Sequence, residues 1–170
     1  MISKEEHIKE ARAKYNSYST DDWIKAGFDE QSGGYFIYHK KHRFDPTIGI
    51  FNIERGKYEK ISSEILMKYG MKVELGSEMP KYKNRVADGL LNGKPFDIKG
   101  VEGTGKENIL KDIKDASKKR AETIVLYYHS ENMFDEKQIR ENYKTYLRNS
   151  KSKRIRQIYY IVDNKLHALK

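Results

Sequence analysis

The sequence predicts an α/β protein with an αβββαβ core, in which a mixed central sheet is flanked by helices. Three observations predict this fold class. Apolar residues recur at helical spacing between positions 58 and 69, ahead of three short strand-like segments. Asn92-Gly93, between two of these segments, is the strongest short hairpin signal in the chain. TIVLYYH (123–129) is a continuous apolar run, typical of a strand covered on both faces of a sheet.

The first 50 residues are predicted to be an N-terminal elaboration with helical and strand segments, not a second full domain. Residues 1–16 are expected to form a charged helix with few apolar positions. Ser19 or Thr20 is expected to cap a short helix that carries three large apolar residues, Trp23, Ile24 and Phe28. Gly33-Gly34 then makes a turn into a strand over residues 35–38 (YFIY). A basic loop, HKKHRFDPTIG, joins this segment to the core.

The core domain is predicted to span residues 51–170. Its first helix ends at Gly70, a residue that commonly terminates helices. The expected elements that follow are strands over 71–75, 86–91 and 95–100, a helix over about 105–121, a strand over 123–129, a helix over about 135–147, a strand over 157–162 and an edge strand KLHAL after the turn at Asp163-Asn164.

The composition favours a polyanionic partner. The net charge is +9 among 170 residues, and proteins with such an excess of positive charge most often bind nucleic acid. A solvated basic surface explains the charge alone equally well. Basic residues gather at Lys118-Lys119-Arg120 and between positions 148 and 156, where a solvated loop and a substrate contact both remain open. No apolar run approaches the roughly 18 residues that span a bilayer, so no membrane partner is expected. The chain has no cysteine, which excludes thiolate metal sites and fits a cytoplasmic site of action.

Two acids and a lysine are expected on one face of the predicted hairpin. Asp97 and Lys99 are two residues apart on its second strand, so their side chains leave the same face. The turn at Asn92-Gly93 brings Asp88 towards them. Such groups are costly to bury for packing alone, whereas carboxylate oxygens suit Mg²⁺ or Mn²⁺. Taken alone, Asp88 is more simply a surface acid near a turn, and Asp97 and Lys99 a surface salt bridge. Their combination favours a metal site that activates water.

A helix wheel adds Glu59 to this group. The apolar stripe of the helix before Gly70 extends to Leu66, and Glu59 falls just beyond its edge at ~100° per residue. Glu59 can therefore reach the place where helix and sheet meet, whereas Glu64 lies further outside the stripe and is expected to be a surface charge.

The helix acid, Asp88, the short hairpin and Asp97-Ile98-Lys99 together resemble the PD-(D/E)xK nuclease superfamily, whose core is restriction-endonuclease-like. The stretch YEKISSEILMKYGMKVEL and the later ADGLLNGKPFDIKGVEGTGKENI are similar to the C-terminal tRNA-nuclease domains of contact-dependent growth inhibition (CdiA-type) toxins. The resemblance covers about residues 57–170. Ala87 stands where the superfamily often has proline, and Asp97 where glutamate is commoner.

The resemblance implies a metal-dependent endonuclease, with tRNA as the favoured substrate. It implies metal ligation by Glu59, Asp88 and Asp97, with Mg²⁺, or Mn²⁺ or Zn²⁺ in its place, and water activation by Lys99. It also implies delivery as a toxin domain and a cognate immunity protein that blocks the site. A DNA endonuclease of the same fold and a non-catalytic nucleic-acid-binding protein remain alternatives.

The segment GVEGTGKE (100–107) comes one residue short of a phosphate-binding P-loop, because Glu107 replaces the required Ser or Thr. The segment is better read as a capping box, in which Thr104 caps the next helix and Glu107 reaches back to it. This would leave Lys106 free to contact a phosphate. Thr104, Lys106 and Asn108 are accordingly the expected substrate-binding residues.

No histidine is assigned to the site. His39 and His42 flank two lysines, and an exposed basic loop is favoured over a role in acid-base chemistry. His129 and His167 are expected to be structural or incidental.

Overall fold

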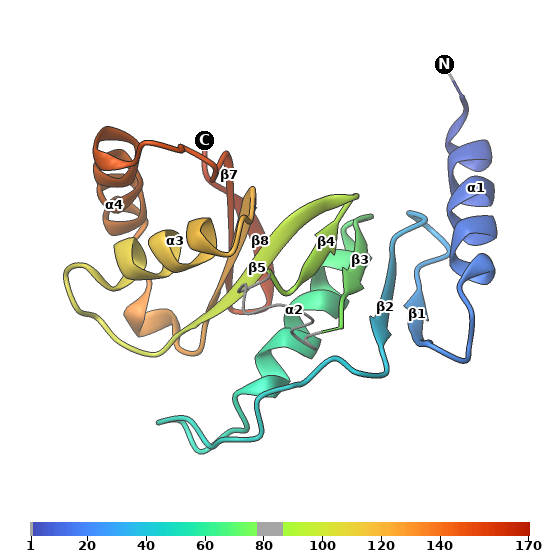
Figure 1. Ribbon diagram of the computed structural model, residues 1–170, viewed down its shortest axis with the longest axis horizontal. Helices are drawn as coiled ribbons and strands as arrows, with labels where there is room; N and C mark the ends of the chain where they lie inside the picture. Colours follow the sequence, from blue (N-terminus) through green and yellow to red (C-terminus); the bar gives the residue numbers. More distant parts are fainter. Residues whose placement is uncertain (1, 78–86) are drawn as a thin grey trace.

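The computed structural model describes residues 2–77 and 87–170, and it confirms the α/β class. An eight-stranded mixed sheet has its strands in sequence order from β1 to β8 (Figure 1). The strands are β1 (Trp23–Phe28), β2 (Tyr35–His39), β3 (Lys72–Leu75), β4 (Gly89–Leu91), β5 (Lys94–Val101), β6 (Thr123–Tyr128), β7 (Gln157–Val162) and β8 (Lys165–Ala168). The helices are α1 (Lys4–Ser17), α2 (Gly56–Lys68), α3 (Asn108–Lys118) and α4 (Glu136–Asn149), with a short 3₁₀ turn η1 (Glu131–Met133).

The sheet is mixed because its strands are linked in two ways. β2–β3, β5–β6 and β6–β7 are parallel, and the other neighbours are antiparallel. Each parallel pair is joined through a helix, since parallel neighbours need a long crossover connection. α2, α3 and α4 are these crossovers, so the order α2, β3, β4, β5, α3, β6 reproduces the predicted αβββαβ core.

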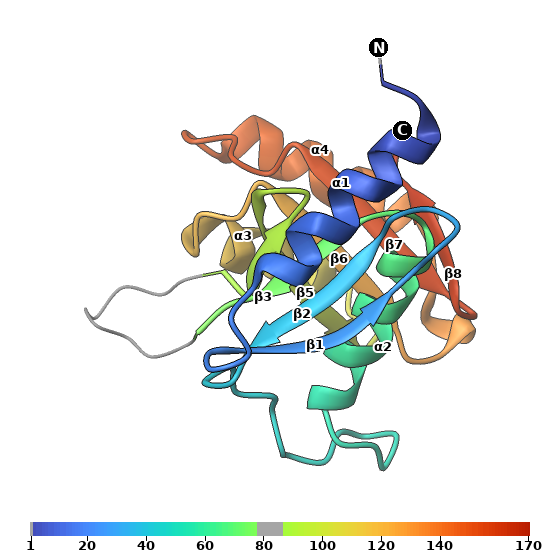
Figure 2. The same cartoon turned by 90° about the vertical axis from the view of Figure 1, so that its right-hand side faces the viewer.

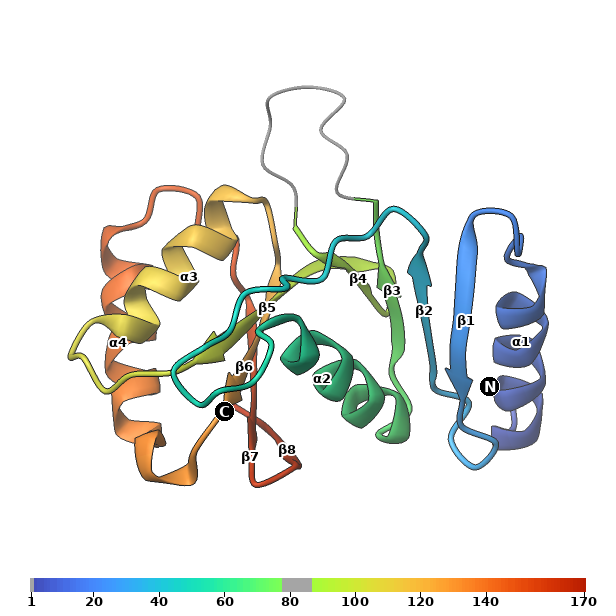
Figure 3. The ribbon, with the colours of Figure 1, turned by 90° about the horizontal axis from the view of Figure 1, so that it is seen from below.

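Two apolar cores lie on opposite faces of the sheet. α2 packs on the face that carries Phe36, Phe96 and Ile98. α3 and α4 cover the other face, where Ile109 and Ile113 meet the alternate residues of β5 and β6. Figure 3 shows α3 and α4 together at one end of the sheet and α1 beside β1 at the other end. Alternation along β5 therefore decides that Asp97 and Lys99 face α3, whereas Phe96 and Ile98 face α2.

The first 50 residues extend this sheet. β1 and β2 form an antiparallel pair, and β2 continues the sheet by pairing with β3 in parallel. α1 lies across these two strands (Figure 2), where the rings of Tyr15 and Tyr18 pack on Tyr35. None of the described helices combines the length and apolar character that crossing a membrane would need.

One predicted element is wrong, and two others are shorter than expected. Trp23, Ile24 and Phe28 lie in the strand β1 and not in a helix, because β1 pairs with β2 and its rings pack on Tyr15, Tyr18 and His39. α3 begins at Asn108 and ends at Lys118, which is shorter than the expected 105–121. The predicted strand over 86–91 begins at Gly89 in the structure, and residue 86 lies outside the described residues.

Candidate active site

Asp88 and Asp97 meet across the hairpin of β4 and β5. Gly89 pairs with Phe96 in this ladder, so the residues that flank this pair, Asp88 and Asp97, are opposite each other. The backbone N–H of Asp88 donates to Asp97 Oδ1 at 3.0 Å, and the N–H of Ile98 donates to Asp88 Oδ2 at 2.7 Å. The carbonyl of Asp88 also accepts from Gly76 at 2.9 Å, which ties it to the end of β3. The expected juxtaposition of these two acids is therefore present.

Both carboxylates are buried. Asp97 is 0% exposed and Asp88 is 9% exposed. Burial, together with the charges of Asp97 and Glu59, raises the pKa of Asp88 well above its ordinary value. The site thus holds more negative charge around Asp88 than its hydrogen bonds compensate.

Lys99 lies among carboxylates, as its position on the face of Asp97 predicts. Its Nζ is 3.3 Å from Asp97 Oδ2 and also donates to Asp115 on α3. Burial disfavours the Lys99 ammonium, but Asp97 and Asp115 outweigh burial and raise the pKa of Lys99 above its ordinary value. Lys99 is therefore a firmly charged cation in this structure and is poorly suited to take a proton from water.

Lys119 closes a network of alternating charges. Its Nζ lies 3.6 Å from Asp97 Oδ2 and 3.4 Å from Asp115 Oδ2. Burial alone would raise the pKa of Asp115, but the hydrogen bond and charge of Lys99 and the charge of Lys119 hold it below its ordinary value. Two ammonium groups and two carboxylates are thus interleaved on the inner side of α3.

Glu59 reaches the same end of the sheet from α2. Its side chain is buried, and Oε2 lies 3.2 Å from His42 Nε2. The other ring nitrogen of His42, Nδ1, is 2.8 Å from the carbonyl oxygen of Gly76, which can only accept. Nδ1 therefore donates to this carbonyl, and Nε2 faces the Glu59 carboxylate. Glu64 is exposed, so the helix wheel separated these two acids correctly.

The prediction that His42 belongs to an exposed loop is wrong. Its side chain is 0% exposed because it fills the space between Glu59 and the carbonyl of Gly76 and packs on Phe44. His39 is partly exposed and packs edge-on against Trp23.

Thr104, Lys106 and Asn108 lie away from these acids. They surround the N-terminal end of α3, whereas Asp115 is near its C-terminal end, about 10 Å further along the axis at 1.5 Å per residue. Thr104 and Lys106 are exposed. The structure therefore brings together Asp88, Asp97 and Lys99, places Glu59 near enough to act on Asp88, and leaves this loop at the opposite end of α3.

The predicted capping box at Thr104 is wrong. Glu107 occupies the cap position of α3 and makes no side-chain cap hydrogen bond. α4 holds this loop instead, because Gln138 Nε2 donates to the carbonyl of Gly105 at 2.6 Å and Asn142 Nδ2 to that of Lys106 at 3.3 Å. The Asn108 side chain fills the inside of the loop, where a Cβ at Gly105 would lie 2.7 Å from Asn108 Oδ1.

Three acidic or basic residues of α3 and its end were not among the predicted site residues, namely Asp112, Asp115 and Lys119. Their spacing of three and four residues places them on one side of the helix, and this was the available signal. Nothing in the sequence marks His42 in the same way.

The carboxylates offer a partial fit for a divalent metal ion. Asp97 Oδ2 is buried and accepts no hydrogen bond of good geometry, and the charge around Asp88 favours an added cation. Oxygen ligands of this kind suit Mg²⁺. Across residues 2–77 and 87–170, however, no three His, Asp or Glu side chains gather closely enough to share one ion. We therefore assign the best fit to Asp88 and Asp97, with Glu59 near them.

Asp112 provides a test of the electrostatics of this site. Burial raises the pKa of Asp112 to about 6. The charge of Lys99 opposes this increase, and the charges of Asp115 and Asp97 add to it. The native state then binds more protons than the unfolded state between pH ~4 and ~6, so this residue lowers stability as pH rises through that range. Asp112→Asn should remove this loss. The variant is expected to be more stable than the original protein above pH 6 by about 1–3 kcal/mol, with the difference closing towards pH 4.

Urea denaturation at pH 4, 5, 6 and 7.5 measures this effect. Asp21→Asn, a change of the same kind at an exposed position, is the control and should follow the original protein at every pH. Parallel stability curves for Asp112→Asn and the original protein would contradict the expected burial of a charge at this position.

One comparison with known proteins matches part of the chain. Residues 85–166 match the family model of the contact-dependent growth inhibition CdiA C-terminal domain, so this segment is similar to toxin domains of the CdiA type. The segment is slightly less than half of the chain. It contains Asp88, Asp97, Lys99, Asp115 and Lys119, but not Glu59 or His42. No curated protein and no solved structure matches the chain.

Proposed function

We propose that this chain is a metal-dependent nuclease of the PD-(D/E)xK type that hydrolyses phosphodiester bonds in RNA, with tRNA as its expected substrate. The observation that carries the proposal is the pairing of Asp88 with Asp97 across β4 and β5, with Lys99 on the face of Asp97. The CdiA match supports a toxin activity, since domains of this type are often nucleases. The preference for RNA rests on the resemblance of the hairpin and its following loop to tRNA-nuclease toxins.

Asp88 and Asp97 would hold the metal ion in this proposal, with Glu59 as a further acid. A divalent ion bound there lowers the pKa of a water molecule and neutralises charge on the phosphodiester. The Asp88 backbone and Lys99 hold the Asp97 carboxylate in place through its two oxygens. Lys99 acts as a fixed positive charge beside the scissile phosphate, because its raised pKa keeps it protonated.

A cognate immunity protein is part of this proposal. CdiA toxin domains typically pair with such a protein. The net charge of +9 favours an acidic inhibitor, since opposite charge speeds association and suppresses wrong partners. As a toxin domain, the chain would act after delivery into the cytoplasm of a target cell.

The direct test is incubation of the purified protein with labelled tRNA and, separately, with plasmid DNA. We expect cleavage of tRNA in Mg²⁺ or Mn²⁺, little cleavage of DNA, and none of either in EDTA. Cleavage of DNA alone would move the assignment to a DNA endonuclease. Salt-dependent binding of RNA without turnover in any metal ion would replace the nuclease with a binding protein.

A further inference from the structure

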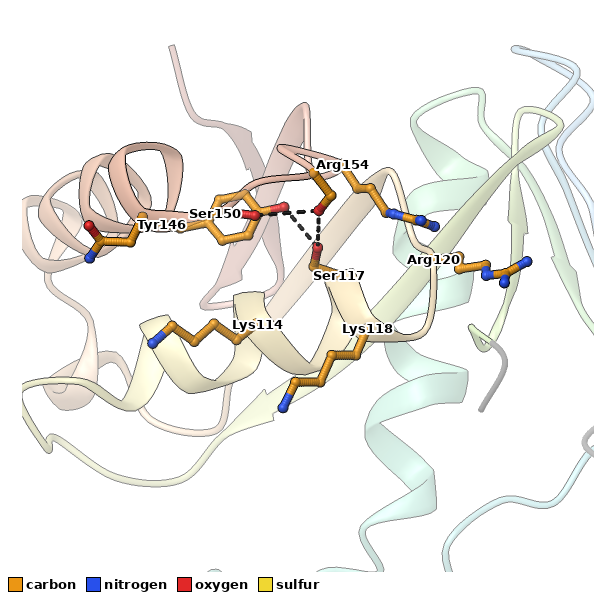
Figure 4. Close-up of a pocket in the computed structure, with 9 residues that line it drawn as sticks. Lys114, Ser117, Lys118, Arg120, Tyr146, Ser150 and Arg154 are labelled. Atoms are coloured by element: carbon orange, nitrogen blue, oxygen red, sulfur yellow. Dashed lines mark hydrogen bonds between the residues drawn. The ribbon is translucent and has the colours of Figure 1, made fainter. Parts of the chain in front are cut away.

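A second site, away from the paired acids, opens between the C-terminal ends of α3 and α4 (Figure 4). It is a pocket of about 430 Å³. Four cationic side chains line it, Lys114, Lys118, Arg120 and Arg154, and none of its lining residues is acidic. Both basic clusters of the sequence contribute, because α4 and the loop after it bring Arg154 back to the end of α3.

Hydroxyl groups form the inner wall of this pocket. Ser117 Oγ and Tyr146 OH are hydrogen bonded at 2.8 Å, and Ser152 Oγ lies 3.5 Å from Ser117 Oγ. Tyr146 also accepts from the backbone N–H of Ile155 at 3.2 Å. Tyr146 is 2% exposed and Ser117 is 9% exposed, so packing fixes both side chains and the wall exists before any ligand arrives.

The cationic side chains of the pocket are not neutralised by acidic side chains of the described residues. Among the described residues, Lys114, Lys118, Arg120 and Arg154 form no ion pair, whereas the neighbouring Lys119 pairs with Asp97 and Asp115. Four positive charges around one cavity repel one another, and an anion would relieve that repulsion. Phosphate oxygens accept hydrogen bonds from both hydroxyl and cationic groups, so a phosphate matches the whole lining.

Arg120 follows the end of α3 in a left-handed conformation, with φ +67°. Glycine is the usual residue at this position after a helix, because a side chain there is strained. The backbone conformation alone would favour glycine here. The arginine instead adds a positive charge to the pocket lining.

We propose that this pocket binds a backbone phosphate of the RNA strand while the strand lies across the paired acids. This inference rests on the proposed nuclease function for the identity of the strand. Lys118 and Lys119 are consecutive, about 100° apart around the helix, so one faces the pocket while the other contacts Asp97. A strand that passes the end of α3 can therefore contact the pocket and the acids together.

Binding of a fluorescein-labelled single-stranded RNA in EDTA tests the pocket without turnover. Lys118→Ala with Arg154→Ala should weaken binding at least tenfold. It should also reduce the slope of log K against log salt by about 0.7, the value for one lost phosphate contact on a single strand. Lys111→Ala with Lys137→Ala removes two exposed charges outside the pocket and should change both quantities much less. Equal losses in the two double variants would overturn the proposal.

Arg120→Gly separates binding from folding. Because glycine suits the backbone at this position, its melting temperature should be unchanged or higher, while RNA binding should weaken three- to tenfold. Unchanged RNA affinity would overturn the contribution of this residue. Titration with inorganic phosphate distinguishes a strand subsite from a small-anion site: if phosphate binds the pocket as tightly as RNA, and the pocket variants bind RNA normally, the strand subsite is overturned.

Cleavage assays keep this proposal separate from the proposed function. If a pocket variant has a higher KM for tRNA and an unchanged kcat, the result supports both the RNA subsite and the nuclease function. A variant with unchanged KM overturns the subsite and leaves the nuclease. RNA binding that depends on the pocket in a protein that cleaves nothing keeps the binding site and removes the nuclease.

Discussion

Asparagine in place of Asp88 is expected to abolish RNA cleavage while the protein remains at least as stable as before. Asparagine can still accept the N–H of Ile98, so the hydrogen bond that fixes the side chain is retained. It cannot supply the negative charge that a metal ion or a developing transition state requires. We expect kcat to fall by at least ~10²–10³-fold, the size of effect seen when one electrostatic group of an active site is removed.

Stability should move in the opposite direction. The pKa of Asp88 is raised in the folded state, so above pH ~4 the native protein binds more protons than the unfolded chain. The native protein therefore loses stability as the pH rises from ~4 towards the raised pKa of Asp88. The neutral amide lacks this loss, and Asp88→Asn should therefore be as stable as the original protein at pH 4 and equally or more stable at pH 7.5. Loss of activity could then not be attributed to unfolding.

Single-turnover cleavage of labelled tRNA and urea denaturation at both pH values measure the two effects. Glu64→Gln, an exposed acid on α2, provides the matched control and should cleave normally. Cleavage by Asp88→Asn at the original rate would remove Asp88 from the site and, with it, the main support for a PD-(D/E)xK assignment.

The part of the site that lies on the hairpin could be predicted because it depends on local rules. Asn92-Gly93 fixes the turn, with φ values of 51° and 82°, and the turn fixes the register. Once Gly89 pairs with Phe96, counting one residue outward places Asp88 opposite Asp97. The position of Glu59 follows in a similar way from the periodicity of one helix.

The network around Lys99 could not be predicted in this way, because it depends on how α3 packs on the sheet. Asp115 and Lys119 are 16 and 20 positions from Lys99 in the sequence, and only the crossover from β5 to β6 brings them together. This packing changes the expected chemistry of Lys99, since two carboxylates hold it as a cation. The pattern D-x-K supplies the residue type but not its protonation state.

The N-terminal errors have a related cause. Trp23, Ile24 and Phe28 can be placed on a short helix, and β1 forms instead because β2 supplies a partner edge and α1 supplies an apolar cover. The end of α3 shows the same effect on a smaller scale. Thr104 has the sequence of a helix cap, but Gln138 and Asn142 on α4 contact the loop instead, and the helix starts later.

Alanine in place of Gly89 is expected to destabilise the protein strongly. A Cβ at this position would lie 1.8 Å from the carbonyl oxygen of Glu74 and 2.9 Å from the Cα of Leu75. Both are backbone atoms of β3, so no side-chain rotation relieves the clash, and the strands must separate. Because overpacking against adjustable side chains already costs about 1–3 kcal/mol, we expect at least ~3 kcal/mol of destabilisation here.

The same change should remove activity, because Asp88 directly precedes Gly89 and owes its position to this ladder. Gly76 donates to the carbonyl of Asp88, and separation of β3 from β4 would break that contact. We therefore expect Gly89→Ala to lose tRNA cleavage even at temperatures where it remains folded. Urea denaturation and single-turnover cleavage at 10 °C measure the two losses.

Gly93→Ala is the matched control in the same hairpin. A Cβ at Gly93 meets no atom within 4 Å, and its only cost is the left-handed backbone at φ +82°, about 1–2 kcal/mol. This variant should be moderately destabilised and should cleave tRNA normally, because the turn lies at the opposite end of the hairpin from Asp88. If Gly89→Ala were as stable and as active as Gly93→Ala, the close approach of β3 to β4 could not be what positions Asp88.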